Sequence, residues 1–401
     1  MTSSITSTTG PATAPGPRWR KPHRVPALRQ ADRAQALLER ADIRLGGDRP
    51  WDLQVHHPDT LRQILKGGSL ALGETYVKGW WDCAQIDAFI CRALRAGVHH
   101  QVACPGRLWA VLRARLLNLQ SMARSWQVAR VHYDLGNDLY EAMLDPSMAY
   151  SCGYWAQASN LEQAQQAKLD LVCRKLELRP GMRLLDIGCG WGSLMRHAAE
   201  HYGVECVGLT ISNAQAEWGQ ARHRGWPIRF ELGDYRRFNP DGAQSFDAVA
   251  SVGMFEHVGH KNYRTFFDMA RRCLCPDGLY LLHTIGKNRS SESTDPWIEK
   301  YIFPNGELPS AARLSASSEH AFVIEDWHNF GADYDRTLMA WQARFEQAWP
   351  TLRARYGERF YRLWRYYLLS CAGTFRARDN QLWQVVMSPN GASGGYRRPL
   401  A

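Results

Sequence analysis

A regular alternation of helical and extended segments between residues 162 and 285 constrains the fold of this chain more than any other feature. Apolar side chains at helical spacing predict helices over residues 162–176, 193–202, 212–225 and 263–274. Short apolar runs predict strands over residues 183–188, 205–210, 228–234, 246–253 and 278–285. Alternation of this kind predicts an α/β fold, in which helices cover both faces of a parallel sheet.

The first predicted strand runs directly into a glycine-rich loop with the sequence LLDIGCGWGSL, residues 184–194. Gly188, Gly190 and Gly192 let the backbone turn tightly and approach a ligand without a Cβ clash. A helix begins near Ser193, and the first turn of a helix has free N–H groups. Because ligands of open α/β sheets bind at the carboxyl ends of the strands, the loop predicts a ligand site.

An acidic residue, Asp186, precedes the first glycine of this loop. The pattern is therefore D-x-G-x-G-x-G, whereas a dinucleotide fold prefers G-x-G-x-x-G and places a pyrophosphate on the helix end. A carboxylate is a poor neighbour for a pyrophosphate but a good partner for the ammonium of an amino-acid group. The loop therefore favours S-adenosylmethionine over NAD as the ligand, with a glycine-rich turn and a helix-capping acid as the alternative.

The ends of the next two predicted strands carry further candidate binding residues. The second strand ends in the neutral Thr210, where such folds usually have an acid for the ribose hydroxyls. Thr210 and Gln215 would then bind the ribose or the methionine end of the ligand. Asp234, at the end of the third strand, fits an acid that reaches the adenine amino group, although a surface turn explains it equally well.

The rest of the chain divides into segments of different composition. Residues 1–27 are rich in Ser, Thr, Pro and basic residues and predict a disordered basic tail. Residues 28–110 predict a small domain with helices over 28–43, 86–97 and from 58 to a glycine stop at Gly67. Residues 111–130 predict an arginine-studded linker helix, which either contacts anionic lipid or packs on the next domain. Residues 131–390 form the predicted catalytic domain, with a helical stretch over 290–375 and a last strand over 382–387, before a tail at 391–401.

Charge and composition limit the classes of partner and compartment. The formal net charge is +10, which favours an anionic partner such as nucleic acid, acidic lipid headgroups or an anionic substrate, with solubility as the alternative. We expect no membrane-spanning helix, because no run of 18 apolar residues occurs, and no secretory signal. The scattered cysteines then indicate reduced thiols in the cytoplasm, and the absence of a Cys-x-x-Cys pair argues against a zinc site.

Longer segments resemble the cyclopropane-fatty-acyl-phospholipid synthases, a family similar to the mycolic acid cyclopropane synthases. The resemblance covers residues 40–390 and is carried by the segments HYDLGNDLYEAMLDPSMAYSCGYW, LLDIGCGWGSL, VGLTISNAQ, MFEHVGHKNY and YIFPNGELPS. It implies a Rossmann-like class I methyltransferase sheet preceded by a small helical domain. It also implies transfer of a methylene group from S-adenosylmethionine to the cis double bond of an unsaturated phospholipid, which forms a cyclopropane ring. A peripheral protein at the inner face of an anionic phospholipid bilayer is expected, and a homodimer is suggested by the resemblance alone.

The resemblance also implies roles for particular residues. The positions that hold a catalytic bicarbonate ion in the family match Cys152, Glu256, His283, Ile285 and Tyr334. Tyr150 and Ser151 match contacts to the methionine end of the cofactor, and Tyr133 is expected to close over the same site. One departure is His260, which stands where members of the family commonly have proline, and which puts the local loop geometry in doubt.

Other functions remain open on the sequence alone. The nearest is a lipid C-methyltransferase whose product carries a methyl branch or a methylene group. A nucleic-acid methyltransferase is suggested by the charge, but the chain has no recognisable RNA-binding module, and MFEHVG stands where the usual amine-methylating motif would lie. We therefore expect no nucleic-acid partner. A non-catalytic lipid carrier is the third alternative, and it would not bind S-adenosylmethionine.

Overall fold

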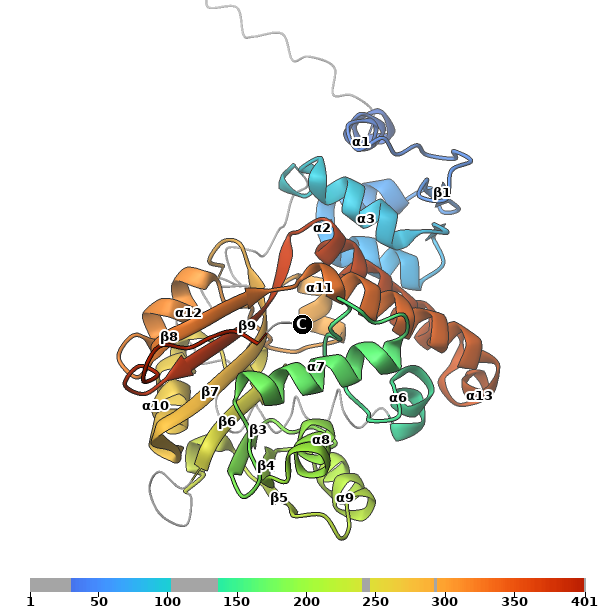
Figure 1. Ribbon diagram of the computed structural model, residues 1–401. Coiled ribbons are helices and arrows are strands. Elements are labelled where there is room, and N and C mark those ends of the chain that lie inside the picture. Colours follow the sequence, from blue (N-terminus) through green and yellow to red (C-terminus); the bar gives the residue numbers. More distant parts are fainter. Residues whose placement is uncertain (1–29, 102–135, 240–245, 292–293, 400–401) are drawn as a thin grey trace, which may run out of the picture.

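A computed structural model describes residues 30–101, 136–239, 246–291 and 294–399 of the chain (Figure 1). The predicted basic tail, the predicted linker helix over 111–130 and Tyr133 lie outside the described residues. Within the described part, no helix is both long enough and apolar enough to cross a membrane.

The centre of the molecule is a seven-stranded sheet in the order β5-β4-β3-β6-β7-β9-β8. Its strands are β3 (Arg183–Ile187), β4 (Glu205–Thr210), β5 (Ile228–Leu232), β6 (Phe246–Val252), β7 (Leu274–Lys287), β8 (Val323–Asn329) and β9 (Asn380–Ser388). The strands from β5 to β7 in this order are all parallel. Apart from the edge strand β5, which alternates with Arg229 and Glu231, these strands are largely apolar, because helices cover both faces of the sheet. The predicted α/β class is confirmed.

Two features of the sheet differ from the prediction. The sheet is not purely parallel, because β9 runs antiparallel to both of its neighbours, β7 and β8. The predicted helical stretch over 290–375 is also wrong for Val323–Asn329, which form β8. This edge strand mixes exposed apolar side chains such as Val323 and Ile324 with acidic and amide residues. An edge strand of this kind lacks the clean alternation by which a half-buried strand is recognised.

Helices pack on both faces of the sheet, as predicted (Figure 1). Successive side chains of β3 point to opposite faces, so that Leu184 packs in one core with Leu194, whereas Leu185 packs in another with Phe266. The helices of this part are α6 (Asn137–Met143), α7 (Leu161–Lys175), α8 (Ser193–Tyr202), α9 (Asn213–Arg222), α10 (Tyr263–Cys273), α11 (Pro296–Tyr301) and α12 (Ala311–Ser318). The segments that the sequence predicts as helices over 162–274 are helices in the structure.

The N-terminal part is small and mainly helical. It comprises α1 (Gln30–Glu39), β1 (Gln54–Val55), α2 (Thr60–Val77), β2 (Trp81–Asp82) and α3 (Ile86–Arg95). The predicted helix end at Gly67 is confirmed, because the backbone is non-helical at Gly68, where φ is 60° and ψ is −142°. A second helical segment follows this kink and continues α2 to Val77.

The longest helical element, α13 (Ala332–Arg376), is a hairpin of two helical limbs. Its backbone breaks at Gly357, where φ is 74° and ψ is 163°. The limbs face each other through the Arg365–Glu346 ion pair of 3.2 Å and the Arg376–Asp335 ion pair of 2.8 Å. This hairpin connects the N-terminal part to the sheet. One aromatic core joins side chains of the N-terminal part to side chains of α13, including Tyr76, Trp81, Trp341, Trp364 and Tyr366. Tyr334 of α13 packs in another group with Leu382 of β9.

Gly73 of α2 permits a close contact between the N-terminal part and α11. A Cβ atom at this position would lie 2.4 Å from the indole ring of Trp297, which is 1% exposed and has no room to move. We therefore expect Gly73→Ala to lower the free energy of unfolding by about 1–3 kcal/mol through overpacking. Urea denaturation measures this change, and the exposed Lys66→Ala on the same helix should stay within about 0.5 kcal/mol of the wild type. Equal stability of the two variants would contradict the prediction.

Candidate active site

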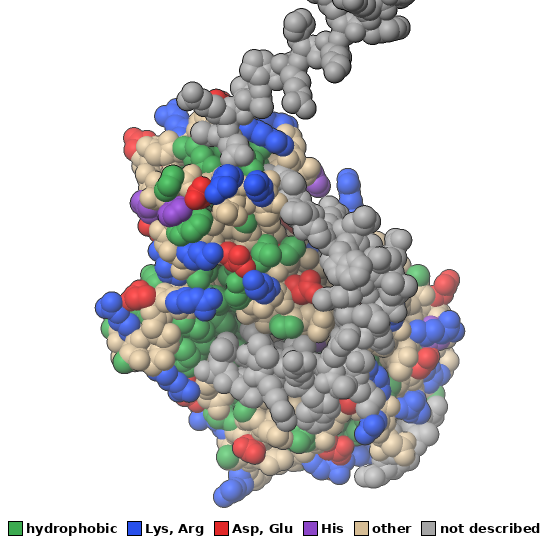
Figure 2. All heavy atoms as spheres, turned by 180° about the vertical axis from the view of Figure 1, so that it is seen from behind, with side chains coloured by type: hydrophobic (Ala, Val, Ile, Leu, Met, Phe, Trp, Pro, Cys, Tyr) green, Lys and Arg blue, Asp and Glu red, His purple; other side chains and the backbone are tan. Residues whose placement is uncertain are grey.

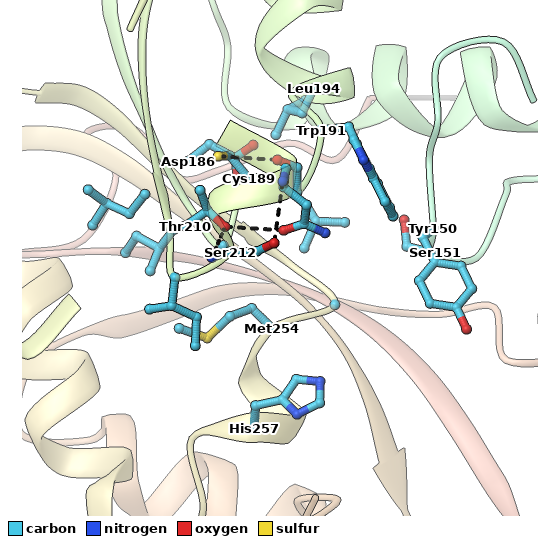
Figure 3. A pocket seen from close by; sticks show the side chains of 18 of the residues that line it. Tyr150, Ser151, Asp186, Cys189, Trp191, Leu194, Thr210, Ser212, Met254 and His257 are labelled. Carbon is cyan, nitrogen blue, oxygen red and sulfur yellow. Dashed lines mark hydrogen bonds between the residues drawn. The ribbon is translucent and has the colours of Figure 1, made fainter. Parts of the chain in front are cut away.

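A cavity of about 160 Å³ lies at the carboxyl ends of the parallel strands (Figure 3). Its walls come from the segments that follow β3, β4, β5 and β6, from α7, and from the loop that carries Tyr150 and Ser151. We call it the strand-end cavity. It lies at the edge of the sheet where the sequence predicts the ligand site, and open α/β sheets bind their ligands there.

The glycine-rich loop forms one wall of the strand-end cavity, and its glycines serve different purposes. Gly188 has a φ of 87°, and a Cβ there would lie 2.5 Å from the Met254 side chain. Gly190 borders the cavity, and the nearest atom to a Cβ there would be 4.0 Å away. Gly192 does not line the cavity. It caps α8 with a φ of 91°, and a Cβ there would lie 2.6 Å from Phe230.

Asp186 ends β3 at the cavity wall. It is 2% exposed, and its Oδ1 atom has no hydrogen-bond partner among the described residues. Burial raises the pKa of the carboxyl to about 7, and the positive charge of Lys168 opposes this shift. A buried carboxyl without a partner favours a ligand that brings a positive charge or a donor.

The side chains that follow β4 form a hydrogen-bonded group on another wall (Figure 3). The Thr210 hydroxyl donates to Gln215 Oε1 at 3.1 Å and accepts from the Ser212 amide at 3.1 Å. The Ser212 hydroxyl caps α9 by accepting from the Gln215 amide. Asp234 follows β5 and also lines the cavity, but its carboxylate binds Arg236, whose Nε lies 2.7 Å from Oδ1.

The five residues that the resemblance assigns to bicarbonate lie together beyond one end of the strand-end cavity. We call them the polar cluster: Cys152, Glu256, His283, Ile285 and Tyr334. Three of these residues, Cys152, Ile285 and Tyr334, pack in one apolar group with Phe330 and Leu382. The Ile285 amide donates to Glu256 Oε1 at 2.7 Å, and the His283 ring contacts the edge of Phe330. None of the five lines the strand-end cavity. Two of them are nevertheless next in the chain to residues that do, because Cys152 follows Ser151 and Glu256 precedes His257.

Burial sets the protonation of the polar cluster. It raises the pKa of Glu256 to about 7 and lowers the pKa of His283 well below its ordinary value, so the imidazole is neutral. Burial also holds the pKa of Cys152 well above its ordinary value, and the sulfur remains a thiol whose Sγ lies 3.2 Å from the Gly153 carbonyl. A neutral thiol is not a nucleophile. Glu256 Oε2 and His283 Nε2 have no hydrogen-bond partner in the described part of the chain.

Sequence reasoning missed Gln384, which lies directly opposite His283 in the pairing of β7 with β9. Its side chain is fully buried, and its Nε2 lies 3.3 Å from His283 Nδ1. The amide donates to Nδ1, so the proton of the neutral imidazole is on Nε2. A glutamine at the centre of the apolar run LWQVVM is the signal that could have revealed it.

Sequence reasoning also missed Lys168, on the buried side of α7. It borders the strand-end cavity, is 1% exposed, and donates from Nζ to the Ser151 hydroxyl at 3.0 Å. Lys168 falls in register with Leu161, Ala164 and Val172, which form the buried stripe of the helix. A lysine in an apolar stripe is the signal, because buried charges are rare without a purpose.

His260, the departure from the family pattern, joins two loops near the polar cluster. It begins the short turn η4 (His260–Asn262), and its Nδ1 lies 2.8 Å from Glu307 Oε2. Glu307 also binds Arg313 at 2.8 Å, and its amide donates to the Glu256 carbonyl at 2.8 Å. The loop after Glu256 is therefore held by side-chain contacts at the position where the family commonly has proline.

The chain matches known proteins over most of its length. The family model described as mycolic acid cyclopropane synthetase matches residues 120–385. The cyclopropane-fatty-acyl-phospholipid synthase of Escherichia coli strain K12 is 54% identical over 367 residues, which cover 91% of this chain and 94% of that protein. A probable fatty acid methyltransferase of Pseudomonas putida is 37% identical over 279 residues, which cover 67% of this chain and 70% of that protein.

Solved structures agree with these matches. The cyclopropane synthase MmaA2 from Mycobacterium tuberculosis has a TM-score of 0.61 at 34% identity, and the match covers 65% of this chain and 97% of that one. Coclaurine N-methyltransferase has a TM-score of 0.64 at 20% identity, over 79% of this chain and 98% of that one, which supports the fold alone. The glycine loop, the strand-end cavity and these matches lead to one conclusion: the chain belongs to the mycolic acid cyclopropane synthetase family of S-adenosylmethionine-dependent methyltransferases.

Proposed function

We propose that this protein transfers a methylene group from S-adenosylmethionine to the cis double bond of an unsaturated phospholipid acyl chain and so forms a cyclopropane ring. The E. coli relative, which aligns along nearly its whole length, supports this reaction and this lipid class. The observation that carries the proposal is the buried polar cluster, with a carboxyl and a neutral histidine, just beyond the strand-end cavity.

The strand-end cavity is the proposed site of S-adenosylmethionine. Asp186 would accept from the α-ammonium, and Tyr150 and Ser151 would contact the methionine end. Thr210 and Gln215 would bind the ribose or the methionine end, since their side chains already form a hydrogen-bonded pair on the wall. Asp234 would reach the adenine amino group while it keeps its bond to Arg236. The sulfonium would then face the polar cluster.

The chemistry requires a positioned alkene and a site without water. An isolated double bond is a weak nucleophile, so holding it close to the sulfonium methyl supplies much of the acceleration. Positive charge then develops on carbon, where water would quench it and aromatic faces stabilise it. Aromatic rings lie next to the polar cluster, where the positive charge would develop. The ring centroids of Tyr150 and Trp341 are 5.2 Å apart, and those of Tyr334 and Trp341 are 6.0 Å apart.

Ring closure also requires loss of a proton, and the polar cluster fits a small oxyanion that takes it. A bound bicarbonate would supply this base. Among the described residues, His283 Nε2 is an unpartnered buried donor and Glu256 Oε2 an unpartnered buried acceptor, which suits an anion with one hydroxyl. The Tyr334 hydroxyl can donate as well. The Ile285 amide orients the Glu256 carboxyl, and the Cys152 thiol, beside the Gly153 carbonyl, is the weakest donor of the cluster.

The lipid substrate places the protein at a bilayer surface. We propose peripheral binding to anionic phospholipid at the cytoplasmic face of the membrane, as a homodimer by analogy with the family. The net charge of +10 supports this, because each Lys or Arg near such a surface contributes about 1 kcal/mol. Figure 2 shows Lys and Arg interspersed with hydrophobic side chains on the N-terminal part. The N-terminal part also has cation–aromatic pairs, such as Arg92 over Trp51 at 4.1 Å and Lys78 over Trp80 at 5.3 Å.

The lipid product tests the proposal directly. The protein is incubated with S-adenosylmethionine and vesicles of unsaturated anionic phospholipid, and the lipids are analysed by mass spectrometry and proton NMR. We expect acyl chains heavier by one methylene that have lost their olefinic protons. The same gain in mass with the alkene retained would make the protein a lipid C-methyltransferase. Absence of both the product and S-adenosylmethionine binding would fit a lipid carrier, and either result overturns the proposal.

Replacement of Glu256 separates a functional carboxyl from a structural one. Glu256→Gln should lower the rate of ring formation about a hundredfold, because the anion loses the acceptor that orients it. The same substitution should also remove a loss of stability that the wild type undergoes as the pH rises. Folding raises the pKa of this carboxyl from 4.5 to about 7, so the wild type loses stability as the pH rises through this window. Between about pH 5 and about pH 8, the free energy of unfolding of the variant should rise relative to that of the wild type by on the order of 3 kcal/mol.

The exposed Glu205→Gln on β4 is the matched control, and it should change neither the rate nor the dependence of stability on pH. Urea denaturation at both pH values gives the free energies of unfolding. A Glu256→Gln protein that is less stable to the same extent at both pH values would indicate a structural residue instead.

Replacement of Gln384 tests how His283 is held. Gln384→Leu removes the donor to Nδ1, so the imidazole proton is no longer confined to Nε2. We expect the bicarbonate concentration for half-maximal rate to rise roughly tenfold, as for loss of other orienting partners. Nitrogen-15 NMR of the histidines should show a mixed tautomer for His283. Gln381→Leu is the control, at another buried glutamine of β9 that binds Arg378. It should change neither the bicarbonate concentration for half-maximal rate nor the tautomer of His283. An unaltered tautomer in Gln384→Leu would refute the assignment.

A further inference from the structure

A buried cation, Lys168, borders the strand-end cavity without a carboxylate partner. Its only hydrogen bond to a described residue goes to the neutral Ser151 hydroxyl at 3.0 Å, and it forms no ion pair with one. Lys175, two turns further along α7, is equally buried but lies 3.4 Å from Asp326 Oδ2. Burial of an ammonium is costly unless a negative charge approaches it. The buried Asp145 acts on Lys168 through its charge, as Asp186 does, but neither carboxylate is in ion-pair contact with it, whereas Asp326 contacts Lys175.

The opposite charge is also present at the same cavity. Asp186 is 2% exposed, lines the cavity, and has an unpartnered Oδ1 within the described part of the protein. The charges of Lys168 and Asp186 interact through space, but the two side chains are not in ion-pair contact. Burial lowers the pKa of Lys168 to about 8, so the ammonium is still mostly protonated at neutral pH. The cavity thus presents one buried cation and one buried carboxyl, each available to a ligand.

A zwitterion is the ligand chemistry that satisfies both groups. The ribose and the adenine of a nucleoside carry neither charge, whereas an α-amino-acid group carries an ammonium and a carboxylate on one carbon. We propose that Lys168 binds the α-carboxylate of S-adenosylmethionine while Asp186 binds its α-ammonium, so that the pair selects ligands with an intact amino-acid end. This inference rests on the proposed function, which places S-adenosylmethionine in the strand-end cavity.

Lys168 also holds the segment that carries Ser151 against α7. Its Nζ holds the Ser151 hydroxyl, and Gln165, one turn earlier on α7, donates to the Ser151 carbonyl at 2.8 Å. The segment that continues into Cys152 of the polar cluster is therefore fastened to α7 at the point where the carboxylate would bind. Lys168 is a binding residue for the cosubstrate and does not contact the reacting carbon.

Isothermal titration calorimetry with three ligands tests the proposal. S-adenosylhomocysteine has both charges, its decarboxylated analogue keeps only the ammonium, and methylthioadenosine has neither. The wild type should bind S-adenosylhomocysteine at least about tenfold more tightly than the decarboxylated analogue, as expected for one charged hydrogen bond. Lys168→Met should weaken S-adenosylhomocysteine about 10–100-fold and should not weaken the other two ligands. Asp186→Asn should weaken both ligands that carry the ammonium.

Matched controls separate the outcomes. Lys175→Met removes an equally buried ammonium that lies outside the cavity, and the ratio of the three affinities should stay as in the wild type. Methylthioadenosine binding reports that each variant is folded. Equal loss of all three ligands in Lys168→Met, or a wild type that does not distinguish the decarboxylated analogue, overturns the inference. A wild type that binds none of the three overturns the proposed function itself.

Discussion

The hydrogen bond from the Ile285 amide to the Glu256 carboxyl is the contact on which the site depends. It joins the turn η3 (Phe255–His257), which follows β6, to the neighbouring strand β7. The main chain of Glu256 is held from a third direction, because its carbonyl accepts from the Glu307 amide. One residue thus fixes three segments at the end of the strand-end cavity. A carboxyl with one oxygen bonded and the other without a partner among the described residues keeps a hydrogen-bond acceptor available in a buried region.

The second constraint is the hairpin of α13, which joins the N-terminal part to the chemistry. Its first limb carries Tyr334 into the polar cluster, and Thr337 accepts from the Gly153 amide and from the indole of Trp155. The segment YSCGYW, residues 150–155, is therefore held between α7 on one side and α13 on the other. Its cysteine is the part least suited to reaction, because burial keeps the thiol protonated. The aromatic core that contains Trp341 of this hairpin extends to Tyr76 and Trp81 of the N-terminal part.

Sequence reasoning predicted the sheet, because the parallel strands are apolar runs separated by amphipathic helices, and a glycine loop marks the strand that meets the ligand. It failed at β8, an exposed edge strand without a pattern. It placed a helix end correctly at Gly67, one residue before the non-helical Gly68. It predicted the location of the cavity, since strand ends follow from topology. It missed Lys168 and Gln384, because a polar residue inside an apolar segment acquires meaning only when its tertiary neighbours are known. Gly192, also predicted to bind the cofactor, is not a lining residue of the strand-end cavity; it caps α8, and a Cβ there would lie 2.6 Å from Phe230.

The position of β9 in the sheet has a consequence for how the protein is made. β9 is the last strand in the chain, yet it lies between β7 and β8, both of which are synthesised earlier. During translation the outer edge of β7 and the strand β8 both lack this partner until β9 has been synthesised. His283 likewise lacks its hydrogen bond with Gln384 until β9 has been synthesised. The polar cluster therefore gains this contact only after β9 has joined the sheet, later than the synthesis of any of its five residues.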